Sequence, residues 1–212
     1  MSISDKIQII KKELPNNVTL VAVSKTKSEE EILQAYNSGH KIFGENKVQE
    51  LVEKYENLPK DIEWHMIGHL QSNKVKYIAP FVNLIHGTDS EKLLKEINKR
   101  AKQNNRIINC LLQVHIAEES TKFGFSSSEI NDIMQRSSEF ENVNIIGLMG
   151  IATFTETISQ IEKEFCSLQQ IYENHPSLTT LSMGMSGDYR SAIKYGSNMI
   201  RLGSIIFGNR NY

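Results

Sequence analysis

Short apolar runs alternate along the chain with stretches of helical spacing. The runs are continuously apolar, which is typical of strands that are buried on both faces of a parallel sheet. The stretches between them place apolar residues three and four positions apart, as on one face of a helix. The pattern predicts strands at Val18–Ser24, Lys41–Gly44, Ile62–Gly68, Val82–Gly87, Ile107–Ile116, Val143–Met149, Leu178–Met183 and Met199–Gly203.

Helix starts are marked by a Ser/Thr-x-x-Glu pattern, in which a hydroxyl and a carboxylate satisfy free amides of the first turn. The N-terminus is also predicted to be helical, because its apolar positions 3, 7 and 10 are separated by charged residues, unlike a secretion signal. The capping pattern occurs at Ser28 to Glu31, Thr88 to Glu91 and Ser126 to Glu129, and helical spacing follows in 32–36, 93–101, 130–134 and 158–172.

About eight strand–helix units predict the α/β class and a single (β/α)8 TIM-type barrel with an extra N-terminal helix. The alternative is an open doubly wound sheet. Its glycine-rich dinucleotide motif would follow the first strand, but Ser24-Lys25-Thr26-Lys27 stands there. No linker or low-complexity tract divides the sequence, so we expect one domain over residues 1–212.

Composition narrows the class of protein. The 212 residues are 39% apolar, which is enough for one sizeable core. The net charge of -1 comes from 24 basic and 25 acidic residues that are mixed throughout, so neither a nucleic acid nor a membrane is an expected partner. Cys110 and Cys166 lack metal-site or redox spacing and are predicted to be packed thiols. Together with the lack of a long apolar stretch, this composition favours a cytoplasmic protein.

Lys25 follows the first apolar run and is a candidate nucleophile. Many lysines at strand ends simply face solvent, and position alone favours that interpretation. Lys27 changes the balance, because an extended chain would place it on the same side as Lys25. A neighbouring like charge and partial burial both lower the pKa of a lysine, toward the range in which the amine attacks a carbonyl. The pattern therefore favours Schiff-base chemistry at Lys25.

The last two strand ends suggest a phosphate site. Glycines there let backbone amides approach an anion, while the hydroxyls of Ser186 and Ser204, Arg201 and a following helix start add positive or donor character. In barrels of this class the loops after the seventh and eighth strands frequently bind phosphate. The other interpretation is that the glycines only permit tight turns.

The histidines carry weaker signals. His65 and His69 are four residues apart, but Gly68 and the change from strand to loop prevent them from sharing a helical face as zinc ligands do. No metal is therefore expected. His40, His86, His115 and His175 are scattered, and packing or solvation explains each of them.

An ordered set of motifs resembles one family over most of the chain. The motifs are Ala22-Val23-Ser24-Lys25-Thr26-Lys27, Phe43-Gly44-Glu45-Asn46 with Val48-Gln49-Glu50, Trp64-His65 through Ile67-Gly68-His69-Leu70-Gln71-Ser72-Asn73-Lys74, Gly147-Leu148-Met149, Ser182-Met183-Gly184-Met185-Ser186 and Arg201-Leu202-Gly203-Ser204-Ile205-Ile206-Phe207-Gly208. Together they resemble the YggS/PROSC family of pyridoxal phosphate homeostasis proteins.

This resemblance implies a barrel similar to the N-terminal domain of alanine racemase, the type III fold of pyridoxal phosphate proteins. It also implies pyridoxal 5'-phosphate (PLP) joined as an aldimine to Lys25. The phosphate would be held by Ser186, Gly203 and Ser204. Arg201 would lie near the ring or the phosphate. The resemblance places Asn46, His65, Ser182 and Met185 around the pocket.

Two segments depart from the family pattern. Gly187-Asp188-Tyr189-Arg190 has Arg190 where an acidic residue is usual. The segment after Met149 lacks the proline that is often present there. Both departures concern loop geometry and leave Lys25 untouched.

Two functions remain open. The first is a carrier or buffer of PLP without substrate turnover, because 212 residues leave no room for the further domain that encloses a racemase site. Its partners would be PLP and PLP-dependent apoenzymes, and on family grounds we expect a monomer. The second is an enzyme, such as a PLP-dependent amino-acid racemase or another lysine Schiff-base enzyme.

Overall fold

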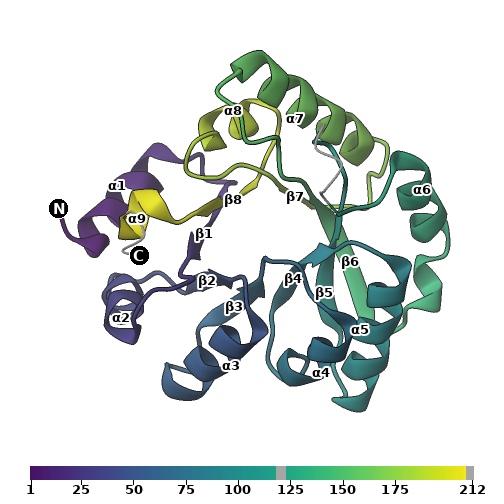
Figure 1. Ribbon diagram of the computed structural model, residues 1–212, viewed down its shortest axis with the longest axis horizontal. Helices are drawn as coiled ribbons and strands as arrows, with labels where there is room; N and C mark the ends of the chain where they lie inside the picture. The colour runs from purple at the N-terminus through teal and green to yellow at the C-terminus, as the bar shows by residue number, and fades with distance from the viewer. Residues whose placement is uncertain (118–122, 209–212) are drawn as a thin grey trace.

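The computed structural model describes residues 1–117 and 123–208, and its centre is a closed barrel of parallel strands (Figure 1). The strands follow one another around the barrel in chain order, and β1 pairs with β8 to close it. The predicted eight-strand barrel is confirmed. The strands are β1 (Thr19–Val23), β2 (Ile42–Glu45), β3 (Glu63–Met66), β4 (Leu84–Thr88), β5 (Ile108–Gln113), β6 (Val143–Met149), β7 (Thr180–Ser182) and β8 (Met199–Leu202).

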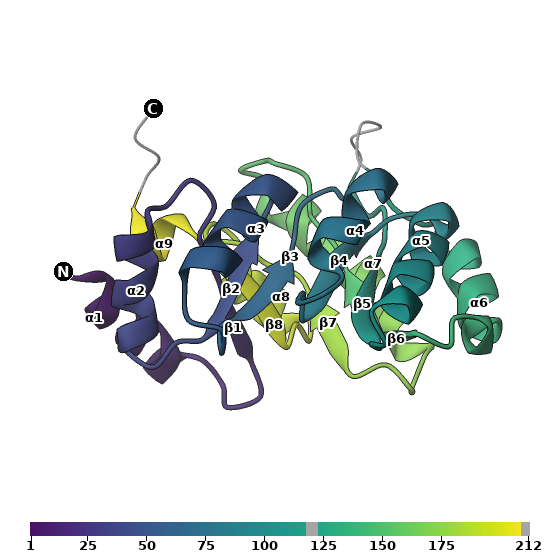
Figure 2. The same cartoon turned by 90° about the horizontal axis from the view of Figure 1, so that it is seen from below.

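Helices surround the barrel on its outside (Figures 1 and 2). The first and last of them, α1 and α9, pack against each other, so the two ends of the described chain lie side by side. The helices are α1 (Ile3–Glu13), α2 (Glu29–Asn37), α3 (Val48–Asn57), α4 (Val75–Ile78), α5 (Glu91–Gln103), α6 (Ser127–Gln135), α7 (Ile158–Glu173), α8 (Tyr189–Lys194) and α9 (Ser204–Phe207), with short 3-10 turns η1 (Ser72–Lys74) and η2 (Ser137–Glu139).

Two of the three predicted capping patterns are present. Ser28 and Ser126 each accept a hydrogen bond from the backbone three residues on, and the glutamate there bonds back to the cap. The prediction for Thr88 is wrong. Thr88 is the last residue of β4 and pairs with Leu112 of β5, so the chain is still extended there and Ser90 caps α5 instead.

Most strands are shorter than the apolar runs that predicted them. The run 107–116 forms a strand only over Ile108–Gln113. The strand ends at Gln113. The amide of Val114 still donates to the carbonyl of Met149, but Val114 forms an isolated bridge with Phe125 outside the strand. Ile107, at the start of this run, is 65% exposed and lies outside the strand.

The apolar residues form two cores. The larger lies between the barrel and its helices and includes Phe43, Trp64 and Phe165, all fully buried. The smaller core fills the inside of the barrel and consists of Val21, Leu84, Leu111, Met149 and Met199. In the part of the chain that the structure describes, no helix has the length and apolarity to cross a membrane.

Candidate functional site

Lys25 lies two residues beyond β1, where the chain leaves the barrel. Val21 faces the barrel interior, and side chains two apart on a strand share a face, so the alternation continued through Val23 carries Lys25 to the inner side of the mouth. The lysine is partly buried. This position matches the one predicted from the sequence.

Lys27 does not lie beside Lys25 as an extended chain would place it. Thr26 has a φ of 64°, in the left-handed region, so the backbone turns immediately after Lys25. The ammonium of Lys27 instead bonds to the carbonyl of Phe207 at 3.2 Å and lies 3.3 Å from Glu31. The turn at Thr26 therefore breaks the extended geometry on which the predicted alignment of the two ammonium groups depended.

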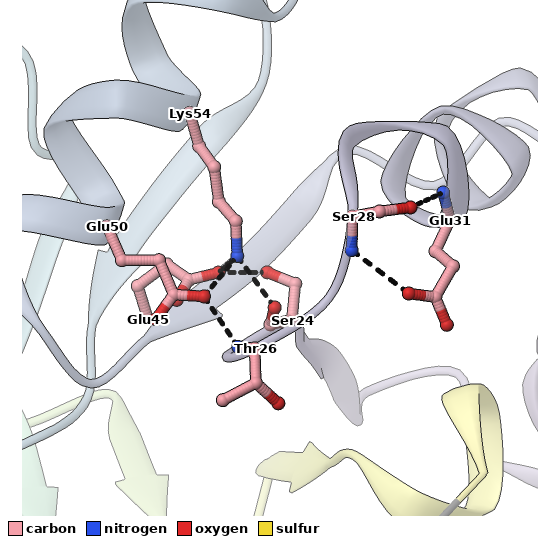
Figure 3. Close-up of polar contacts among 7 residues, drawn as sticks. All are labelled: Ser24, Thr26, Ser28, Glu31, Glu45, Glu50 and Lys54. Atoms are coloured by element: carbon pink, nitrogen blue, oxygen red, sulfur yellow. Dashed lines mark hydrogen bonds and ion pairs between the residues drawn. The ribbon is translucent and has the colours of Figure 1, made fainter. Parts of the chain in front are cut away.

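A buried polar cluster lies behind the turn that carries Lys25 (Figure 3). Lys54 of α3 donates to Glu45 Oε1 at 2.8 Å, to Glu50 Oε1 at 2.7 Å and to the carbonyl of Ser24 at 2.8 Å. Ser24 Oγ donates to the same Glu45 oxygen at 2.6 Å, and the amide of Thr26 donates to Glu50 Oε1 at 2.5 Å. Burial raises the pKa of Glu45, against the opposing effect of Lys54.

The two candidate phosphate loops meet at the other side of Lys25. The amide of Gly203 donates to Ser186 Oγ at 3.2 Å, which ties the loop after β7 to the turn after β8. A Cβ at Gly203 would stand 3.4 Å from the backbone of Val23, so this turn lies against the end of β1. The structure therefore brings Ser186, Gly203 and the strand end leading to Lys25 together, with Ser204 exposed at the first position of α9.

A turn with its own hydrogen bonds presents Ser186. The amide of Met185, which is 39% exposed, donates to Asp188 Oδ1 at 2.6 Å, and the amides of Asp188 and Tyr189 donate back to its carbonyl. Burial raises the pKa of Asp188. Arg190 points away from this turn, bonding to the hydroxyl of Tyr189 and to Glu13 of α1. The sequence departure at Arg190 therefore falls on the outside of the barrel.

A chain of four hydrogen-bonded side chains lies across the barrel above its apolar core. His65 Nδ1 lies 3.1 Å from His86 Nε2, and His86 Nδ1 lies 3.1 Å from Ser182 Oγ. Arg201 Nη1 donates to the same hydroxyl at 2.6 Å and to the Ser182 carbonyl at 3.0 Å. Three of these residues were candidates from the resemblance; His86 was not, since its partners lie about twenty or more positions away in the sequence.

The charges along this chain follow from burial. Burial lowers the pKa of His65 to about 3 and that of His86 well below its ordinary value, so both imidazoles are neutral. Burial also lowers the pKa of Arg201 to about 10, which leaves the guanidinium charged at neutral pH. Because arginine only donates, Ser182 Oγ accepts from Arg201. Two proton arrangements then fit the rest of the chain: Ser182 donates to His86 and His86 to His65, or His65 donates to His86 and His86 to Ser182.

Asn46 adds an uncommitted polar group next to β2. Its Oδ1 is buried and has no hydrogen-bond partner among the described residues. Gly68 makes the close approach of β2 and β3 possible here, since a Cβ on it would stand 2.5 Å from the carbonyl oxygen of Asn46. A buried amide oxygen without a protein partner is costly unless a ligand or water meets it.

Residues 1–117 and 123–208 contain no group of three or more His, Cys, Asp or Glu side chains placed to hold a metal ion. His69, half exposed, bonds to Asp89 and stacks on Phe123, whereas His65 points inward. Cys110 is buried and Cys166 partly buried, and both are free thiols.

The comparisons with known proteins cover nearly the whole chain. The family model described as "Alanine racemase, N-terminal domain" matches residues 1–211. A "Pyridoxal phosphate homeostasis protein" from Aquifex aeolicus is 40% identical over 203 residues, covering 93% of this chain and 89% of that protein. The chain belongs to the pyridoxal phosphate homeostasis protein family. A "Pyridoxal phosphate homeostasis protein" from Escherichia coli is 35% identical over 206 residues, covering 93% of this chain and 88% of that protein.

Solved structures agree with this family assignment. PipY from Synechococcus elongatus, solved without PLP, superposes with a TM-score of 0.91 at 33% identity, covering 98% of this chain and 100% of that one. The same protein with PLP bound gives 0.89 at 32% identity. Alanine racemase from Clostridium difficile shares the fold at 13% identity, with a TM-score of 0.79, and this chain covers 57% of it. The predicted likeness to the racemase N-terminal domain is confirmed.

Proposed function

We propose that this protein binds PLP at the mouth of the barrel and acts in PLP homeostasis, as the names of its relatives state for those proteins. One observation carries the proposal. The amide of Gly203 and the hydroxyl of Ser186 are joined beside the end of β1, so a phosphate-binding loop pair and the lysine-bearing turn share one mouth. Residues 1–212 would act as one domain.

The residues at the mouth fit the chemical groups of PLP. Ser186 Oγ accepts from Gly203 and keeps its own proton for an anion, and Ser204 adds a second exposed hydroxyl. The buried guanidinium of Arg201 supplies a fixed positive charge that favours an anionic ligand. Asn46 Oδ1, Met185 and the imidazole of His65 offer further contacts around a ring.

Lys25 is the amine that we propose to bond with the aldehyde carbon. Its nitrogen adds to the carbon, the carbonyl oxygen leaves as water with both amine protons, and a carbon–nitrogen double bond remains. Lys54 is unsuited to this role, because its three hydrogen bonds use all three ammonium protons. Lys27 is bonded to Phe207 and Glu31 on the outer side. When bound, the cofactor would supply its reversible carbonyl chemistry, and the protein a site of reversible storage.

The proposal includes binding without substrate turnover. A general base works best when its pKa lies near the working pH, but the pKa of His65 is about 3 and its imidazole accepts no proton at neutral pH. Asp188, whose pKa is raised, is engaged with the amide of Met185. Among the ionisable groups at the mouth other than Lys25, His65 and Asp188 therefore favour holding a ligand over moving a proton at its α carbon.

The remaining parts of the proposal concern partners. A carrier at an open mouth would release PLP to PLP-dependent apoenzymes, and we propose that it does so as a monomer in the cytoplasm. The free thiols of Cys110 and Cys166 suit a reducing compartment. Sedimentation of the purified protein with and without PLP tests the monomer, and reactivation of an apoenzyme tests the transfer.

The decisive experiment is borohydride reduction of the PLP-loaded protein followed by mass spectrometry of its peptides. We expect one reduced adduct, located at Lys25, and its loss in Lys25→Ala. Lys27→Ala is the matched control and should keep the adduct. An adduct at another lysine, or none in the wild type, would overturn the covalent proposal. Deuterium exchange at the α position of amino acids at catalytic turnover would instead favour the enzyme.

A further inference from the structure

Lys54 and its two carboxylate partners hold the backbone on both sides of Lys25. On one side, the carbonyl of Ser24 accepts from Lys54 Nζ at 2.8 Å and from the amide of Lys27 at 3.0 Å. On the other side, the amide of Thr26 donates to Glu50 Oε1 at 2.5 Å. Figure 3 shows the ammonium of Lys54 next to both carboxylates and to Ser24 at the start of the turn. The peptide groups that flank Lys25 are thus bonded to one buried cluster.

The turn needs such support, because Thr26 adopts a left-handed conformation at a φ of 64°. For a residue with a Cβ this conformation is unfavourable and persists only where the surroundings hold it. Ser28, which caps α2, ends the same turn with a second hydrogen-bonded pair to Glu31. The direction in which Lys25 leaves the backbone is therefore set by contacts that Lys25 does not itself make.

The cluster connects α3 with the end of β1 through buried charges, and burying charges is energetically unfavourable. Glu45 is fully buried and the Lys54 side chain is 7% exposed, so both charges have lost nearly all of their hydration. Replacing a buried ion pair by apolar residues of similar size is often neutral or stabilising. Glu45 also leaves Oε2 without a partner among the described residues. Stability alone gives a weak reason for this arrangement at the strand end next to the candidate site.

We propose that Lys54, acting through Glu45 and Glu50, is a positioning residue that fixes the direction of Lys25 for carbon–nitrogen bond formation. This inference rests on the proposed function. It separates two properties of the site: binding of the phosphorylated ring by the loops after β7 and β8, and attack by the amine from the turn after β1. Loss of the cluster should leave the candidate phosphate loops intact, because the hydrogen bond between Gly203 and Ser186 does not involve it.

The test compares Lys54→Met with wild type in two assays. The first follows the rate at which the PLP adduct at Lys25 forms. The second measures equilibrium binding of pyridoxine 5'-phosphate, whose alcohol cannot form the bond. We expect the rate to fall about tenfold or more, since small misplacements of a reacting group have large effects, while affinity for the alcohol stays within about twofold. Lys54→Arg, which keeps charge and donors, should recover most of the rate.

Two further variants complete the design. Glu50→Ala removes the acceptor of the Thr26 amide at a side chain that is 22% exposed, so it tests the same point with little risk to folding. Lys95→Met removes a matched i,i+4 ion pair with Glu91 on α5 and should change neither assay. An unchanged rate in Lys54→Met and Glu50→Ala, or a rate that falls only in parallel with affinity, would overturn the inference. A wild type without an adduct at Lys25 would instead defeat the proposed function.

Discussion

Arg201 donates a 2.6 Å hydrogen bond to the hydroxyl of Ser182 inside the barrel, where Ser182 is fully buried and Arg201 nearly so. The guanidinium also bonds to the carbonyls of Ser182 and Gly150. A single serine thus joins the buried cation to two neutral histidines, because its oxygen also contacts His86. The floor of the candidate site is therefore rigid and positively charged.

Removal of this hydroxyl should destabilise the fold. In Ser182→Ala a charged donor loses an acceptor in the barrel interior, and we expect the free energy of unfolding to fall by about 1–3 kcal/mol. Urea unfolding with an unchanged m value would measure it. Ser186→Ala is the control, since Ser186 is only partly buried, and should shift the free energy by less than about 0.5 kcal/mol. Equal losses in the two variants would contradict this account of Ser182.

Stability should also fall in mild acid. The pKa of His86 is depressed in the folded protein, so the unfolded chain binds more protons as pH drops below the ordinary value of 6.5. Each such histidine contributes stability that is full above pH 6.5 and falls by about 1.4 kcal/mol per pH unit below it. His65, with a pKa of about 3, and His40, with one of about 4, add to the slope.

His86→Leu should therefore make the free energy of unfolding less dependent on pH between 6.5 and 5. Denaturant titrations at several pH values would measure the slope, and a decrease of about 1.4 kcal/mol per pH unit is expected. Ser127→Ala serves as the control, because it changes an exposed side chain that carries no ionisable group and should leave the slope unchanged. The same slope in His86→Leu and wild type would show that folding does not depress the pKa of His86.

The glycines of the β7 loop offer a matched pair of backbone tests. Gly184 has a φ of 96°, and a Cβ there would stand 2.7 Å from the Cβ of Ala192. Gly184→Ala should therefore destabilise the protein by about 1–3 kcal/mol and displace Ser186, two residues on. Gly187 has open space around it, so Gly187→Ala should be nearly neutral. Thermal unfolding distinguishes the two, and equal Tm values would count against a strained turn at Gly184.

The sequence predicted the strands and the barrel, which follow from local periodicity. It did not predict the turn at Thr26 or the buried polar contacts, which depend on residues from several elements. The apolar run ending at Ser24 correctly predicted that Lys25 follows the first strand, because the end of a strand can be inferred without tertiary information. The left-handed turn at Thr26 could not be anticipated, since threonine rarely adopts it and Glu50 supports it from another element.

Two further residues show the same limit. Helix α3 was not predicted, and Lys54 is part of the reason: a charged residue on its buried face interrupts the apolar stripe. His86 became a site residue only when β3, β4, β7 and β8 were placed around one interior, since its partners His65 and Ser182 lie far from it in the chain. Buried polar networks of this kind leave no periodic signal.

The phosphate loops themselves can be tested without the covalent step. Ser186→Ala and Ser204→Ala should each weaken binding of pyridoxine 5'-phosphate about tenfold to a hundredfold, because a hydrogen bond to a charged group contributes about 1.5–3 kcal/mol. Ser127→Ala, an exposed serine at the start of α6, should leave the affinity unchanged.

Calorimetry with pyridoxine, which has no phosphate, identifies the group that the loops recognise. Wild type should bind pyridoxine far more weakly than pyridoxine 5'-phosphate. This difference in affinity should shrink in Ser186→Ala, because the variant lacks the hydroxyl proposed to bond to the phosphate. If both serine variants kept the full preference for the phosphate, the anion would be bound elsewhere. The junction of Ser186 with Gly203 would then be a structural tie between two loops.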